Sequence, residues 1–127
     1  MQLQTYSFST GVVALAGTDG LQVAQTVVLS TDADFAVHSL CGGAIQSSAL
    51  VGTWAGRVQI QTESVGSTWF NTDILFDSIA GNGRYPFILD PPKLVPSKTS
   101  IIVSFTQEGT TATDVELVFH GNKVFGA

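Results

Sequence analysis

The feature that most constrains the fold of this chain is an alternation of apolar and polar residues with a period of two. Successive side chains of a β-strand point to opposite faces, so this period is typical of a strand that is buried on one side. It is clearest in the segments 100–106 and 113–124, whose inward-facing residues are expected to be Ile101, Val103 and Phe105 in the first and Val115, Leu117 and Phe119 in the second. No stretch of about 12 residues or more shows the spacing of an amphipathic helix.

Turn signals divide the alternating segments at a spacing of roughly ten residues. Asp19-Gly20 and Ser30-Thr31-Asp32 are examples, since these residue types favour tight turns. Short strands at this spacing are typical of a sandwich or a small barrel. The 127 residues are therefore predicted to form one all-β domain, residues 1–127. Its expected fold is an antiparallel β-sandwich of jelly-roll type with about eight strands.

Three segments carry more specific expectations. Residues 11–16 form a short apolar run, which predicts a strand buried on both faces. Residues 34–40 predict a strand with Phe35 and Leu40 on opposite faces, because five positions separate them. Residues 41–52 contain paired glycines and scattered apolar residues, and they are compatible with either a strand or a loop with one helical turn.

Two connections can also be interpreted. Asp90-Pro91-Pro92 and Pro96 bracket a stretch that cannot be a central strand, because proline donates no ladder hydrogen bond. We expect this stretch to be a surface loop. Residues 107–110 contain a glycine between the two clearest strands, and they are expected to join those strands as a hairpin.

Charge is scarce in this chain. Charged residues make up 12% of it, against about 25% in a typical globular domain. The net charge is −5 and the mean hydropathy is +0.31. Because exposed charge normally keeps monomers apart, these values favour an exterior largely covered by partners, as in a homo-oligomer (dimer or trimer), over a weakly charged monomer. No two basic residues are adjacent, so neither nucleic acid nor an anionic membrane surface is an expected partner.

The sequence offers little for catalysis or for metal binding. Cys41 is the only cysteine, which excludes an internal disulfide and favours a small buried hydrophobe. His38 and His120 have no second ligand at a recognised spacing, and Asp32-Ala33-Asp34 lacks the glycine and glutamate of a calcium loop. No nucleophile elbow is present. We expect neither an enzyme nor a bound metal or cofactor.

Targeting signals and membrane spans are likewise not expected. The first residues lack a basic region followed by an apolar run, and no segment reaches roughly 18 apolar residues. The expectation is a protein that is made in a cytoplasm and stays soluble or assembles there.

Two tryptophans are the alternative functional candidates. Trp54 and Trp69 belong to an aromatic-rich middle third of the chain, and most such residues are expected in the core. A carbohydrate-binding module would instead expose one or two of them as stacking platforms. The sequence leaves both interpretations open.

Six phrases follow one another along the chain in a recognisable order. They are Asp32-Ala33-Asp34-Phe35, Gly56-Arg57-Val58, Tyr85-Pro86-Phe87, the proline-rich stretch 90–96, the strand 100–106, and His120-Gly121-Asn122-Lys123-Val124-Phe125. Their order resembles the small β-sandwich accessory proteins of tailed-bacteriophage virions, including capsid decoration (cement) proteins. The resemblance covers most of the chain, but residues 41–52 do not align with it.

The resemblance implies a non-enzymatic protein that binds the outer shell at subunit junctions and stabilises it. It implies the major capsid protein as partner, the capsid exterior as location after assembly in the host cytoplasm, and no catalytic residues. The alternative is a carbohydrate- or receptor-binding module, or a structural subunit, of a phage tail or fibre. The candidate partner contacts are Pro91, Pro92, Lys93, Pro96, Trp54 and Trp69, followed by residues 41–52 and the N-terminal strand.

Overall fold

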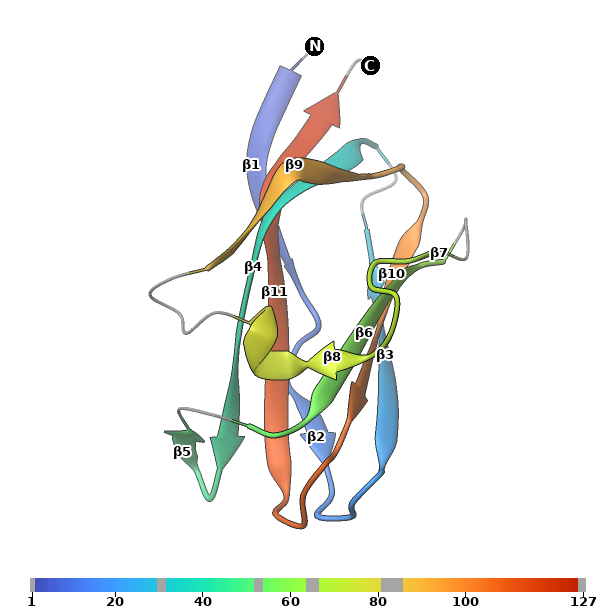
Figure 1. Ribbon diagram of the computed structural model, residues 1–127. Coiled ribbons are helices and arrows are strands. Elements are labelled where there is room, and N and C mark those ends of the chain that lie inside the picture. Colours follow the sequence, from blue (N-terminus) through green and yellow to red (C-terminus); the bar gives the residue numbers. More distant parts are fainter. Residues whose placement is uncertain (1, 30–31, 52–53, 64–66, 81–85, 126–127) are drawn as a thin grey trace.

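The fold is a sandwich of two antiparallel sheets that pack face to face (Figure 1). The computed structural model describes residues 2–29, 32–51, 54–63, 67–80 and 86–125. These residues contain eleven strands and one turn of 3-10 helix. The predicted all-β sandwich is confirmed. The strand number exceeds the expected eight because several strands have only two or three residues, too short for an alternating pattern to reveal.

The first sheet, called sheet A, is built around two strands of 13 residues each, β4 and β11. Its strand order is β1-β11-β4-β5, with β2 also paired to β11 and β9 also paired to β4. The strands are β1 (Gln2–Ser9), β2 (Val13–Leu15), β4 (Asp34–Gln46), β5 (Ala49–Val51), β9 (Phe87–Val95) and β11 (Thr113–Phe125).

The second sheet, called sheet B, has the order β3-β10-β6-β7, with β8 also paired to β6. Its strands are β3 (Gln22–Val28), β6 (Arg57–Thr62), β7 (Ser67–Thr68), β8 (Ile74–Leu75) and β10 (Ser100–Thr106). The 3-10 turn η1 (Phe76–Ser78) follows β8 and lies across one side of the sandwich (Figure 1). Backbone hydrogen bonds attach this region to Gly56 before β6 and to Gly42 of β4, so it links the two sheets.

The core lies between the sheets and is filled by every second residue of the central strands. The predicted inward-facing residues of β10 and β11 are all buried, as are Val58 and Ile60 of β6. This outcome follows from the alternation, because only one face of each central strand meets the opposite sheet.

A bulge in β4 overturns one expectation. Ser39 pairs with His120 and Val37 pairs with Gly121, so His38 is an extra residue on β4 with no partner in the ladder. One inserted residue reverses the alternation beyond it. Phe35 and Leu40 are therefore both buried, and the prediction that they lie on opposite faces is wrong.

Three further segments differ from expectation or resolve it. β10 and β11 belong to different sheets, so residues 107–110 cross the sandwich instead of forming a hairpin. The run 11–16 contains β2, which buries Val13 and Leu15 and exposes Ala14, so only one face of the strand is buried. Residues 41–46 extend β4, and a turn at Ser47 and Ser48 leads into β5. The expected turn at 30–32 falls mostly outside the described residues.

Candidate functional site

Trp54 lies in the core and is not available as a binding platform. Its side chain is 4% exposed, and its ring meets Phe76 edge-on with centroids 5.3 Å apart. The indole Nε1–H donates to Oε1 of Gln107 at 3.1 Å, and the backbone N–H donates to Oδ2 of Asp77 at 3.1 Å. The interpretation of Trp54 as a partner contact is therefore wrong, because the hydrophobic and polar parts of its ring are both used internally.

Trp69 closes one side of the sandwich. It is half-buried, and its Nε1–H donates to Oγ1 of Thr62 at 3.0 Å. The ring meets Phe119 edge-on at 5.8 Å between centroids, and the Lys93 Nζ lies 5.7 Å from the ring centroid. The ring is thus held by side chains of β6, β9 and β11, which makes it a packing element of the sandwich.

The proline-rich segment is an edge strand and not the expected surface loop. β9 pairs with β4 at both of its ends, and the register shifts between Val37 and Ser39. Residues 89–92, including the cis Asp90–Pro91 bond, bulge out opposite this shift. Pro91, Pro92, Lys93 and Pro96 are exposed, as a contact role requires. The expectation that this stretch is not a central strand is confirmed.

An extended uncovered surface in the described part of the chain is the outer face of sheet A. Residues paired across neighbouring strands share a face, so the register defines this surface. Its rim carries exposed apolar side chains, including Ile88 at 65% and Leu94 at 58% exposure. Leu3 on β1 and Leu50 on β5 extend the rim. The registers place all four on the face opposite the core.

Side-chain hydrogen bonds hold the centre of this outer face. Ser7 Oγ and His120 Nδ1 lie 2.8 Å apart, and Asn122 Nδ2 and His38 Nε2 also lie 2.8 Å apart. On the same face, Ser9 Oγ donates to Oε2 of Glu116 at 3.1 Å. Rows of paired polar groups between β1, β11 and β4 therefore leave a surface whose side chains are already oriented.

The charged side chains on the outer face of sheet A are of one sign. Asp114 and Glu116 of β11 point outward near β5, and Asp34 lies at the far end, where its Oδ1 accepts from the backbone N–H of Ser97 at 2.8 Å. None of the described strands contributes a lysine or arginine to this face. Lys93 of β9 and Lys123 of β11 pair with core-facing residues of β4 and so lie on the opposite side of the sheet. Two of these three acidic residues, Asp114 and Glu116, therefore lie near β5.

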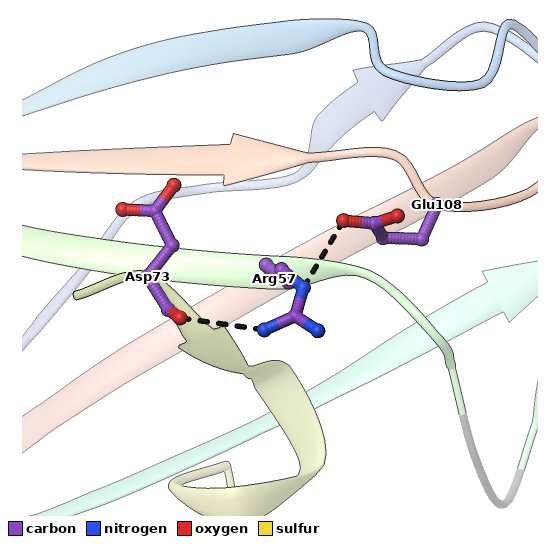
Figure 2. Close-up of polar contacts among 3 residues, drawn as sticks. All are labelled: Arg57, Asp73 and Glu108. Atoms are coloured by element: carbon purple, nitrogen blue, oxygen red, sulfur yellow. Dashed lines mark hydrogen bonds and ion pairs between the residues drawn. The ribbon is translucent and has the colours of Figure 1, made fainter.

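On the outer face of sheet B, by contrast, the cationic side chain of Arg57 is bound by other groups of the protein. Arg57 Nε lies 3.1 Å from Oε1 of Glu108, and Arg57 Nη1 donates to the backbone O of Asp73 at 3.4 Å (Figure 2). These contacts join β6 to the crossing segment after β10 and to the residues before β8. Gln, Ser and Thr make up much of the rest of this face.

The described residues contain no cluster of three or more His, Cys, Asp or Glu side chains that could hold a metal ion. Every buried side-chain nitrogen or oxygen among them has a hydrogen-bond partner. Cys41, which the sequence predicts to be buried, is half-buried on the outer face of sheet A. No helix in the described ranges is long and apolar enough to cross a membrane.

Comparison with protein families, curated proteins and solved structures finds no match to this chain. The function is therefore argued from the surfaces. The sequence did indicate one strand of the outer face of sheet A. In β1, polar and apolar residues still alternate, although the apolar residues are few. The ends of β9, broken up by prolines in the sequence, gave no such signal.

Proposed function

We propose that this protein is a non-enzymatic structural protein of a phage virion, a decoration protein that binds the outer capsid shell at subunit junctions. The observation that carries the proposal is the outer face of sheet A, an uncovered surface with a rim of exposed apolar side chains. The order of sequence phrases resembling virion accessory proteins and the low charge both support it.

The mechanism is reinforcement by binding. A ligand that binds only the assembled shell stabilises that shell over its separated subunits by RT ln(1 + [L]/Kd). Ile88 and Leu94 at one edge and Leu3 at the other can bury apolar surface against neighbouring coat subunits. The hydrogen-bonded centre needs little ordering on contact, which lowers the cost of binding.

The charge distribution specifies the complementary surface. Asp114 and Glu116 lie at the end of the face near β5, so the shell should present neutral or basic residues there. Opposite charges across an interface mainly steer the encounter and select the partner.

The test uses capsids that lack this protein. Added protein should co-sediment with the shells and raise their rupture temperature, measured by light scattering during heating. Leu94→Asp should weaken co-sedimentation at least tenfold, because a charge would be buried in the contact. Val28→Asp is the matched control, since Val28 is an exposed strand residue on the outer face of sheet B.

Absence of wild-type co-sedimentation, or equal loss in both variants, would contradict the proposal. A low-resolution image of the parent particle with the protein located distinguishes the shell from the tail as the site of binding. The carbohydrate-binding alternative is not proposed, because Trp54 and Trp69 are both committed to internal contacts.

A further inference from the structure

The edge strands on the two sides of the sandwich differ in length and in how well they are protected from pairing with another strand. On one side the edge strands are β5, β7 and β8, which have three residues or fewer, and β9, which is broken by prolines and a bulge. Short strands, prolines and bulges are devices that prevent one sheet edge from pairing with another. On the other side the edges are the eight-residue β1, the seven-residue β3 and the three-residue β2, which lies against β3.

β1 has none of these protective devices. Its sequence Gln-Leu-Gln-Thr-Tyr-Ser-Phe-Ser contains no charge, proline or glycine, and its register with β11 has no shift. Among the described residues β1 pairs only with β11, so one side of its backbone is free. An edge of this kind is a ready template for another strand.

The register identifies which backbone groups are free. The N–H of Thr10 donates to the carbonyl of Leu117 at 3.0 Å, which continues the β1–β11 register by one step. In an antiparallel pair, alternate residues bond to the neighbouring strand and the residues between them point away. The backbone groups of the even-numbered residues of β1 therefore face β11, and the free groups belong to Leu3, Thr5, Ser7 and Ser9.

We propose that this edge binds the same edge of a second copy of this chain, antiparallel, about a two-fold axis through Tyr6. In that register Leu3 pairs with Ser9 of the second copy, and Thr5 pairs with Ser7. The free backbone groups of all four residues then gain partners, with about eight hydrogen bonds across the interface. The two Tyr6 side chains face each other in a non-hydrogen-bonded pair, where aromatic side chains interact well.

The chemistry of the strand favours a second copy over another partner. Every pair in this register is uncharged, so the edge is complementary to itself. The nearby Lys123 Nζ lies 4.1 Å from the Tyr6 ring centroid, in a cation–π contact within the same copy. The two-fold contact uses the β1 edge of each copy once, so it leaves no β1 edge for a third copy and the assembly closes as a dimer.

The proposed contact between the two β1 edges is large enough for a specific interface. Eight residues span about 27 Å, and the edge is roughly 20 Å deep when both sheets and their side chains are included. The dimer would bury roughly 1,000 Å² in total, the lower limit for a specific interface. This proposal goes beyond the capsid function and concerns the isolated protein.

The first experiment is cross-linking in a Cys41→Ser background. Tyr6→Cys places two thiols in a non-hydrogen-bonded pair with Cα atoms about 4.5 Å apart, within disulfide range. Mild oxidation should give a covalent dimer. Ser7→Cys is the control, because the two Ser7 positions are offset and lie beyond the roughly 7 Å limit. Cross-linking of both variants alike, or of neither, would overturn the register.

The second experiment measures mass by size-exclusion chromatography with light scattering. The wild type should have twice the chain mass of 13.3 kDa, and Thr5→Val should keep this mass. Thr5→Pro removes an outward N–H and should give a monomer whose circular dichroism is unchanged. If that variant misfolds, Thr5→Lys replaces it, since two lysines near the axis repel each other.

A monomeric wild type at every concentration, or a dimer that survives Thr5→Lys, would refute the proposal. The capsid function and the dimer can be refuted independently of each other. Loss of capsid binding with an intact dimer counts only against the capsid function, and a monomer that still reinforces shells counts only against the dimer.

Discussion

Gln107 should be among the most sensitive positions in the molecule, although it lies outside the strands. Its side chain is 1% exposed and its amide makes three hydrogen bonds. Oε1 accepts from the Trp54 indole at 3.1 Å, and Nε2 donates to the carbonyls of Ala16 at 3.3 Å and Thr111 at 3.0 Å. One side chain thus joins the residues around Ala16 and Trp54 to the crossing segment that contains Gln107 and Thr111.

The change Gln107→Leu keeps the size of the side chain and removes all three bonds. The indole N–H and two carbonyls would be left without this partner, and each buried group costs about 1–3 kcal/mol. Some of these groups can move toward water near the crossing segment, which lowers their summed cost. We therefore expect the free energy of unfolding to fall by about 3–5 kcal/mol. That is a large part of the total stability of about 5–15 kcal/mol of a domain, and corresponds to a fall in Tm of roughly 10–20 °C.

Urea unfolding followed by tryptophan fluorescence measures this loss. Gln22→Leu, at an exposed position of β3, should change stability by less than about 0.5 kcal/mol. Trp54→Phe removes one donor and should cost about 1–2 kcal/mol. Combined with Gln107→Leu it should cost less than the sum of the two, because the variants share a bond. A cost below about 1 kcal/mol for Gln107→Leu would refute the reasoning.

Three other changes test the packing. Gly121→Ala should cost at least about 2 kcal/mol in urea unfolding, because an added Cβ overlaps the carbonyl of Ala36; Gly43→Ala, which meets only a side chain at 3.8 Å, should be nearly neutral. Arg57→Ala should cost less than about 1 kcal/mol, and the cost should shrink in salt, since its ion pair is exposed. Trp69→Ala should cost about 2 kcal/mol by thermal unfolding, as expected for a half-buried aromatic ring.

The sequence predicted the central strands well because their alternation is fixed by burial of one face. β10 and β11 alternate without interruption, and the structure buries the expected residues. It could not predict the bulge at His38, since one extra residue in a ladder leaves no local signal and is identified only by the partner strand. Residues 107–110 have the composition of a hairpin, and only the pairing of β10 with β3 and β6 shows that they cross between sheets.

The candidate surface was harder to predict for a related reason. Pro91 and Pro92 lie at the surface as predicted, but their role as a protected edge depends on pairing with β4. Trp54 was a candidate by residue type alone, and the partner that satisfies its buried indole N–H, Gln107, is 53 positions away. The properties of a surface depend on which strands lie at the edges of the sheets. The topology of the fold decides which strands these are.

The two proposals reinforce each other through sheet A. Pairing of β1 with its two-fold mate would make sheet A continuous across the dimer, so the outer faces of both copies would form one surface. A dimer that engages two sites on a shell binds the second one at a high effective concentration, and its avidity can exceed the single-site affinity by about 10²–10⁴. Weak contacts through Ile88 and Leu94 would then suffice on a lattice that repeats its sites. A single isolated coat subunit offers no second site, so the same dimer would distinguish the assembled shell from its parts.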